Sequence, residues 1–255
     1  GAVIGPAFAL LYLYYFPNDY QTLFYIAFIP GILAVFATRF LKDKNRIASI
    51  EKKSTSFFSF LQYWKVSPKP YKKLVVGLLA FTLFNSSDIF LLLQTKQAGA
   101  NDTMVIALYI FYNLIYALTA FPLGIIADKI GLKRIFIFGL CIFAIVYFGI
   151  SFSKNIYVLI GLFLLYGIYA AATEGVSKAW ISNISSTKDT ATAIGTYSAF
   201  QSICTMLASS LAGLIWYKFG ANTTFLITAI ATCMVIFYFL FTFKINCLKT
   251  TKGLK

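Results

Sequence analysis

Residues 124–134 read Gly-Ile-Ile-Ala-Asp-Lys-Ile-Gly-Leu-Lys-Arg, and they connect two long apolar blocks. Gly124 permits two helices to pack closely, and Gly131 permits the left-handed backbone of a tight turn. Asp128 is an anion among basic residues, where it can interact with the N-terminus of a neighbouring helix by dipole and ion pair. The stretch therefore predicts a short turn between two helices that carries a charged cluster.

Outward from this turn, the chain consists of apolar blocks separated by polar connections. A helix that spans the hydrocarbon core of a bilayer needs about 20 mostly apolar residues, and the blocks lack the period-2 alternation of a membrane β-barrel. We therefore expect an all-α membrane protein, a multi-helix transmembrane bundle with about eight spanning helices. No charged leader precedes the first block, so we expect it to be part of a membrane helix and not a signal peptide. The blocks cover residues 1–16, 20–40, 74–93, 103–124, 133–153, 156–178, 190–217 and 222–243.

The composition favours the same class of protein. Hydrophobic residues make up 60% of the 255 residues and charged residues only 12%, against about 25% in soluble domains. So few charges cannot cover a soluble domain with a polar surface. The absence of histidine excludes His-based zinc sites, haem ligation by histidine, and Ser-His or Cys-His catalysis. The four cysteines form no CxxC pair, and we expect no metal, no cofactor and no enzymatic activity.

The basic residues are distributed unequally between the two sides of the predicted bundle. Of the 22 Lys and Arg residues, all except Lys96, Lys154 and Lys218 fall in connections on one side. Because positively charged loops remain in the cytoplasm, we expect the basic loops and the C-terminus to be cytoplasmic. The formal net charge is +14, but its short runs between apolar blocks favour this topological role over nucleic-acid binding.

The segment 41–73 is the one long polar connection, and it separates two spans from six. We expect four regions: spans in 1–40, a cytoplasmic linker in 41–73, six spans in 74–243 and a cytoplasmic tail in 244–255. Apolar and aromatic residues recur at helical spacing within the linker. They predict a short amphipathic helix on the anionic inner leaflet, with a solvated loop as the alternative. These residues are Phe57, Phe60, Leu61 and Trp64.

A few polar and charged residues lie inside the apolar blocks and are candidates for function, because charges in a membrane are costly. Asp88 follows Asn85 in the third block. Its carboxylate is suited to take up and release a proton or to bind a cationic substrate, and a polar anchor to a neighbouring helix is the alternative. Tyr166 and Tyr169 lie on one polar face of the sixth block. A similar face in the fourth block carries Tyr109, Tyr112, Asn113 and Tyr116.

Glu174 and Lys178 are four residues apart, with the acid first, which is the favourable order for an ion pair on a helix. Both are expected near the basic side of the bundle. We therefore expect a gating network in which they join Asp128 and Arg134, and which breaks when that side opens. The alternative is that the charges of the 124–134 stretch only fix topology.

The 124–134 stretch resembles the cytoplasmic signature of the major facilitator superfamily, Gly-x-Leu-Ala-Asp-Arg-x-Gly-Arg-Arg/Lys-Arg. Ile126 and Lys129 are conservative departures, and Leu132 replaces a residue that is usually basic. The matching residues are Gly124, Ala127, Asp128, Gly131, Lys133 and Arg134.

Two further stretches are similar to the same family. Residues 1–6, with Gly1, Gly5 and Pro6, resemble the G-x-x-x-G-P element of helix five in family exporters, although the glycines that usually follow are absent. Residues 173–179 resemble the E-G-x-x-[KR]-A element of helix ten. The resemblance implies that the blocks are helices five to twelve of a partial major facilitator fold, and that 1–40 holds the last two helices of an N-terminal bundle.

The resemblance also implies a function. A secondary active transporter is expected to move a small molecule by alternating access between two bundles. Proton-coupled efflux by an antiporter is the favoured direction, and proton-coupled uptake of a small metabolite is the alternative; a channel or an intramembrane enzyme would be a different class. Helices seven and ten line the family's cavity, which favours Asp88, Asn85, Tyr166 and Tyr169 as substrate or proton-coupling residues. The expected setting is a monomer in the plasma (cytoplasmic or inner) membrane, with a small-molecule substrate, protons and lipid as its partners.

Overall fold

The computed structural model describes residues 3–16, 19–38, 40, 59–153 and 155–243. These residues form α-helices and contain no β-strand, which confirms the predicted all-α class. The chain divides into two compact units, Gly1–Ser59 and Phe60–Lys255.

The first unit contains two apolar helices, α1 (Ile4–Tyr15) and α2 (Tyr20–Thr38). Asp19 stands directly before α2. One of its carboxylate oxygens accepts a hydrogen bond from the Thr22 backbone N–H at 3.2 Å, and the other accepts one from the Tyr12 hydroxyl at 2.8 Å. Because the first N–H groups of a helix lack partners within the helix, this carboxylate caps α2 and ties it to α1.

The residues expected to form a helix-packing element lie at the start of α1. Gly5 and Pro6 are in its first turns, whereas Gly1 lies outside the described residues. A Cβ atom added at Gly5 would meet nothing within 4 Å, and Gly5 borders an apolar groove between α1 and α2. The surface around this glycine is therefore open within its own unit.

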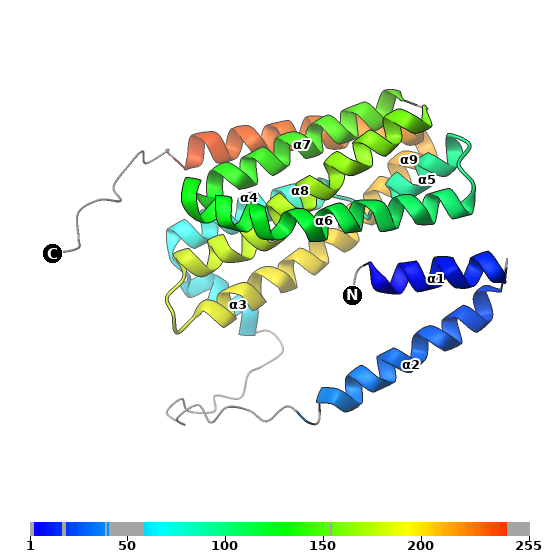
Figure 1. Cartoon of the computed structure of the whole chain (residues 1–255). Coiled ribbons are helices and arrows are strands. Elements are labelled where there is room, and N and C mark those ends of the chain that lie inside the picture. Colours follow the sequence, from blue (N-terminus) through cyan, green and yellow to red (C-terminus); the bar gives the residue numbers. More distant parts are fainter. Residues whose placement is uncertain (1–2, 17–18, 39, 41–58, 154, 244–255) are drawn as a thin grey trace. The chain divides into compact units, whose positions relative to one another are not determined.

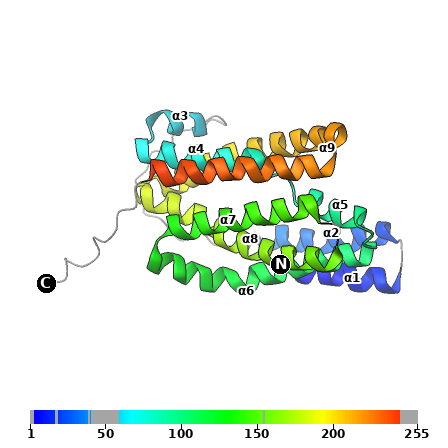
Figure 2. The same ribbon diagram turned by 90° about the horizontal axis from the view of Figure 1, so that it is seen from above.

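The second unit is a bundle of long helices that run side by side (Figure 1, Figure 2). Within the bundle α7 packs against α8 and α9, α6 packs against α8, and α4 packs against α9. Its elements are α3 (Ser59–Val66), α4 (Lys69–Phe84), α5 (Ile89–Gln97), α6 (Asp102–Ile130), α7 (Leu132–Phe152), α8 (Ile156–Ile184) and α9 (Thr190–Thr242).

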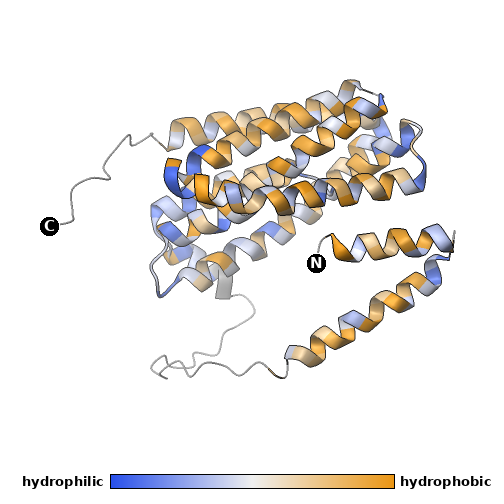
Figure 3. Cartoon of the chain, in the orientation of Figure 1, coloured by the Kyte–Doolittle hydropathy of each residue, from blue (hydrophilic) through white to orange (hydrophobic). Residues whose placement is uncertain are grey.

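Six helices in the described part of the chain are long and apolar enough to cross a membrane, with α4 and α5 together forming one of them. α9 has 53 residues, but Gly220 has non-helical angles (φ 84°, ψ 169°), so α9 consists of two successive segments. With the shorter α1, every predicted block appears as helix. Hydrophobic residues follow the lengths of these helices, and hydrophilic residues gather toward their ends (Figure 3).

The outer surface of α7 shows why the second unit needs a lipid environment. Phe138, Ile145, Phe148 and Phe152 lie on one helical face, and about half or more of each side chain is exposed. The opposite face carries fully buried residues such as Phe143. A helix that is apolar on all sides, yet half exposed, is typical of a bundle surrounded by lipid.

The turn at 124–134 has the predicted form. α6 ends at Ile130, α7 begins at Leu132, and Gly131 alone separates them with φ 104°. L-amino acids with a side chain rarely adopt this conformation. The glycine therefore permits the reversal between the two helices.

The linker helix α3 contacts the bundle through two aromatic residues. Trp64 packs edge-on against Phe200 of α9, with ring centroids 5.5 Å apart, and both Tyr63 and Trp64 contact Tyr71 of α4. Burial raises the pKa of the Tyr63 hydroxyl. Tyr63 and Trp64 of α3 thus pack against α4 and α9. Residues 41–58 and the tail 244–255 lie outside the described residues.

Candidate functional site

The third predicted span is interrupted at Asn85, Ser86, Ser87 and Asp88, where the sequence predicted a continuous helix. Asn, Ser and Asp side chains compete for backbone hydrogen bonds, which explains why the helix stops at this run. Unpaired backbone groups inside a membrane need partners within the protein. One of them is satisfied by α9, because the Ser87 backbone N–H donates to Ser209 Oγ at 3.3 Å.

Asp88, at the end of this break, is held by two tyrosines. The Tyr112 hydroxyl of α6 donates to Oδ2 at 2.6 Å, and the Tyr166 hydroxyl of α8 donates to Oδ1 at 2.5 Å. Both tyrosines are buried, and Asp88 is half-buried. Hydrogen bonds to a carboxylate are about twice as strong as neutral ones. This arrangement, which we call the Asp88 cage, connects the start of α5 to both α6 and α8.

Asn85 lies at the other end of the break and has one partner on α8. Its Nδ2 donates to the Tyr169 hydroxyl at 3.0 Å. Its Oδ1 is buried and has no hydrogen-bond partner among the described residues. The break therefore contains a buried, unsatisfied acceptor three residues before Asp88.

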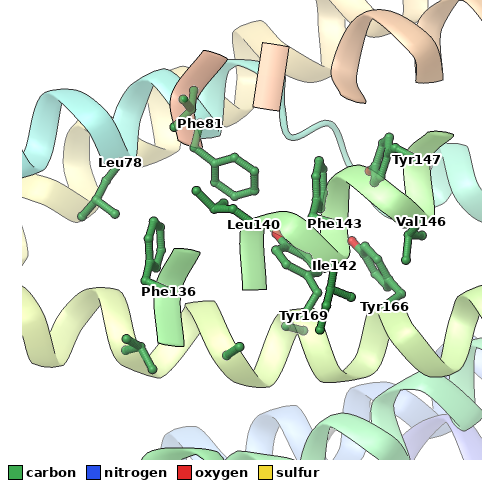
Figure 4. Packing of buried hydrophobic residues seen from close by; sticks show 14 of the residues in the cluster. Leu78, Phe81, Phe136, Leu140, Ile142, Phe143, Val146, Tyr147, Tyr166 and Tyr169 are labelled. Carbon is green, nitrogen blue, oxygen red and sulfur yellow. The ribbon is translucent and has the colours of Figure 1, made fainter. Parts of the chain in front are cut away.

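An aromatic cluster supports this site from the side of α7. Phe143 contacts Tyr169, with ring centroids 4.7 Å apart, and stacks on Tyr147 at 4.0 Å. Phe81 of α4 packs edge-on against Phe143 at 5.0 Å. In Figure 4, Phe81, Phe143 and Tyr169 converge from three helices, with Tyr166 beside them. This packing fixes the side chains that approach the break.

Gly167 brings α8 close enough to α6 for the cage to form. A Cβ atom at this position would lie 2.6 Å from the Tyr112 backbone oxygen and 2.8 Å from the Ile115 Cβ. The adjacent residue, Tyr166, points its hydroxyl at Asp88. The absence of a side chain at Gly167 is therefore a condition for the geometry of both tyrosines.

A cavity of about 520 Å³ in the second unit has the break at residues 85–88 in its wall. We call it the central cavity. This volume is in the range of small-molecule sites. Its wall comes from α4, α5, α8 and the first segment of α9, with contributions from α6 and α7. The lining residues are Leu78, Phe81, Thr82, Asn85, Ser86, Ser87, Asp88, Ile89, Leu92, Tyr109, Phe136, Tyr169, Thr173, Glu174, Ser177, Tyr197, Gln201 and Thr205.

The residues predicted to bind substrate or protons therefore come together. Asp88, Asn85 and Tyr169 line the cavity. Tyr166 is not a lining residue, but its hydroxyl donates a hydrogen bond to Asp88. Sequence reasoning did not select Tyr112, although it lies on the polar face noted for the fourth block. The spacing of tyrosines along α6 was the available signal, but it did not show which of them faces Asp88.

The residues of the expected gating network lie at separate places in the second unit. Glu174 lines the central cavity, and the Tyr116 hydroxyl approaches its carboxylate closely enough to interact with it. Lys178 is exposed one turn further along α8. In the described part of the chain, no ion pair joins Asp128, Glu174 and Lys178 to one another.

Asp128 lies at a second pocket, of about 270 Å³, between α6 and α8. Gly124 and Gly175 also line it. α6 packs against α8 and α7, whereas α9 packs against α4 and α7. The structure thus places Asp128 beside α8.

The two basic residues of the motif lie in the first turn of α7. Lys133 is partly buried, and its ammonium group donates to the Phe243 backbone oxygen at the end of α9. Arg134 is exposed next to it. The motif therefore contacts the end of α9 through Lys133. Within the described residues, no group of Cys, Asp and Glu side chains is arranged to hold a metal ion.

The fold and the cavity define a class: a helical, multi-pass membrane protein in which one face of a bundle carries a polar, aromatic-walled site. The family model of the Major Facilitator Superfamily matches residues 74–247, and the chain belongs to that family. It is similar to a protein of Methanocaldococcus jannaschii described as an uncharacterized MFS-type transporter, with 33% identity over 232 residues. That match covers 89% of this chain and 56% of the relative, so the chain spans little more than half of the relative's length.

Proposed function

We propose that the chain forms part of a secondary active transporter that moves a small molecule across the membrane by alternating access. The observation that carries this proposal is a carboxylate, Asp88, at a helix break in the wall of a cavity within a membrane-spanning bundle. Ionisable groups inside membrane proteins usually mark an ion or substrate path. Discontinuous helices build the binding sites of many secondary transporters.

Asp88 is the proposed proton-coupling group. Protonation removes the negative charge, and the two tyrosine hydrogen bonds then lose their charge-assisted strength. The start of α5 is released from α6 and α8, because the same carboxylate holds both. Proton uptake therefore loosens one joint in the cavity wall, which is the kind of local change that biases a two-state bundle.

The direction and setting of transport are further parts of the proposal. Efflux in exchange for protons is favoured by the resemblance of Gly5 and Pro6 to an exporter element, and proton-coupled uptake is the alternative. The basic loops face the cytoplasm, in keeping with the positive-inside rule. The protein acts as a monomer in the plasma membrane.

The test uses the native full-length protein in proteoliposomes that contain the pH-sensitive dye pyranine. A panel of amphipathic compounds is added outside, with the lumen acidic for efflux-type exchange or the exterior acidic for uptake. We expect saturable proton movement with at least one compound. Asp88→Asn should abolish gradient-driven transport of that compound, while exchange across the membrane continues at compound concentrations high enough to saturate the variant.

Three outcomes contradict parts of this proposal. Full pH-driven transport by Asp88→Asn leaves Asp88 as a structural anchor. Compound flux that does not saturate indicates a channel, and chemical conversion of the compound indicates an enzyme. Size-exclusion profiles of the two proteins in detergent show whether the substitution affects folding.

The 124–134 motif is proposed to act as a gate at the basic end of the bundle. Asp128 and Gly124 line the pocket between α6 and α8, so a change of charge there alters how these helices meet. We expect Asp128→Asn to shift the equilibrium between access states by about tenfold toward the state open on the basic side.

The gate is measured by thiol labelling of Ser177→Cys, a cavity position, in a background in which the four native cysteines are serine. Asp128→Asn should raise the labelling rate from the basic side, and Asp102→Asn, an exposed acid in a surface ion pair with Lys96, serves as the control. Unchanged labelling together with normal transport shows that the motif is only a topological turn.

A further inference from the structure

We propose that the cavity of the second unit selects an organic cation, which it holds between the carboxylates of Asp88 and Glu174. This inference rests on the proposed transport function and adds the substrate class to it. Glu174 becomes a binding residue in this proposal, although its sequence position suggested a gate.

The charges that line the cavity are of one sign. Asp88 and Glu174 are both lining residues, and the described lining contains no Lys or Arg. A carboxylate inside a membrane protein normally has a cationic partner, because an uncompensated charge there is costly. Two carboxylates without a basic residue on the same wall leave that place open to a cation from solution.

The wall of the cavity suits an organic cation better than a bare metal ion. Phe81, Tyr109, Phe136, Tyr169 and Tyr197 contribute aromatic rings to it. The face of an aromatic ring attracts a cation, and it also contacts the apolar groups that an organic cation carries. Alkali and alkaline-earth ions prefer a shell of oxygen atoms instead.

The two hydroxyls closest to Asp88 already use their hydrogens. Tyr112 and Tyr166 already direct their hydroxyl hydrogens to Asp88. The buried Oδ1 of Asn85 has no donor among the described residues. These two tyrosine hydroxyls are therefore not free to donate to a neutral or anionic ligand.

The two carboxylates are placed at successive positions along the bundle. Asp88 accepts a hydrogen bond from Tyr112, and Glu174 interacts with Tyr116. Tyr116 is one turn further along α6 than Tyr112, about 6 Å along the helix axis. On α8, Glu174 is two turns from Tyr166 in the direction of the basic end. A cation that leaves Asp88 therefore finds a second carboxylate on the way to that end.

Lys178 is the nearest candidate for an internal partner of Glu174, since it is one turn away on α8. It does not line the cavity, and no ion pair joins the two in the described part of the chain. Glu174 is exposed and faces the cavity, so its carboxylate is available to a ligand.

The experiment measures binding to the purified, native full-length protein in detergent. The probes are tetraphenylphosphonium and benzyltrimethylammonium, both cations, and tetraphenylborate, an anion with the shape of the first. We expect saturable binding of at least one cation and none of the anion. Asp88→Asn and Glu174→Gln should each weaken cation binding at least tenfold, whereas Asp102→Asn, an exposed acid outside the cavity, should leave it unchanged.

The outcomes separate this inference from the transport proposal. Equal binding of tetraphenylborate, no binding of either cation, or unchanged binding by Glu174→Gln overturns the cation site, even if gradient-driven transport of another compound is found. Saturable cation binding that both substitutions weaken supports the site, and a simultaneous lack of any gradient-driven flux overturns the transport proposal alone. Glu174→Gln alters an exposed side chain, so it remains informative if Asp88→Asn fails to fold.

Discussion

The second unit contains two interruptions of apolar helix that differ in kind. The break at residues 85–88 has no glycine, and its residues keep ordinary negative φ angles, such as −88° at Asn85 and −53° at Asp88. The break inside α9 consists of Gly220 alone, with φ 84°, beside the exposed Phe219. One interruption depends on side-chain chemistry, and the other depends on backbone freedom.

The two breaks differ in the features that distinguish a binding site from a connecting turn in a membrane protein. At Gly220 the chain only needs a residue without a Cβ, because the turn joins two segments. At 85–88 the helix gives up backbone hydrogen bonds inside a span, and polar side chains from α6, α8 and α9 contact the break in return. Such a costly arrangement is expected where ligands bind.

The largest expected effect comes from removing the cage at the first break. Tyr112→Phe combined with Tyr166→Phe deletes both donors to Asp88 and leaves a half-buried carboxylate without them. Each lost bond should cost about 1.5–3 kcal/mol of stability, and transport should fall below detection. Thermal unfolding in detergent and proteoliposome flux measure this, with Tyr157→Phe on the exposed start of α8 as the control. An unchanged melting temperature would show that the two bonds do not stabilise the break.

A smaller effect is expected when α6 and α8 are forced apart. Gly167→Ala places a Cβ 2.6 Å from the Tyr112 backbone oxygen, which should cost about 1–3 kcal/mol and lower the transport rate by displacing the cage. The matched control is Gly161→Ala on the same helix, where an added Cβ meets nothing within 4 Å. Equal melting temperatures of the two alanine variants would show that α6 and α8 are not closely packed at Gly167.

The second break should respond in stability alone. Gly220→Ala forces a residue with a side chain into a conformation that is essentially restricted to glycine, at a cost of about 1–3 kcal/mol. Because Gly220 does not line the central cavity, the substrate concentration for half-maximal transport should stay the same. A change in that concentration without a change in stability would remove the distinction between the two breaks.

The smallest effect is expected at an ordinary helix start, Asp19 in the first unit. Hydrogen bonds from the Tyr12 hydroxyl and from Thr22 lower the pKa of the Asp19 carboxyl. A lowered pKa in the folded state means that the cap stabilises α2 above the carboxyl's ordinary pKa, and that this contribution is lost as pH falls through the folded value. Hydrogen exchange at the Thr22 amide should accelerate a few-fold relative to its intrinsic rate in acid, and Asp19→Asn should remove this pH dependence. A variant that keeps the same pH profile contradicts the capping role.

Much of the fold follows from local rules in the sequence. The apolar blocks predict the spans because length and hydropathy are properties of the chain alone, and Gly131 predicts the reversal between α6 and α7 because few residues adopt its backbone angles. The break at 85–88 was missed, since a count of apolar residues does not register a short polar run between them. The Asn-Ser-Ser-Asp order itself was the signal for it.

The candidate site was predictable in part. Asp88 and Asn85 were recognised as polar residues in an apolar block, and Tyr166 and Tyr169 by their shared face. The direction of Glu174 was not predictable, because a helix of 29 residues such as α8 has polar side chains on more than one face and only packing sets its rotation. The role of Gly167 depends on a contact with Tyr112, which lies on another helix.

The Asp88 cage has a consequence for how sequences of this kind diverge. One carboxylate satisfies two hydroxyls from two helices. Losing Asp88 leaves two buried hydroxyls without their acceptor, and losing either tyrosine leaves the half-buried carboxylate with one donor fewer. Single replacements should therefore be selected against, and neutral drift should pass through joint replacements. Among related proteins, Asp88, Tyr112 and Tyr166 are expected to be inherited or lost as a set, and their covariation should identify which relatives share this site.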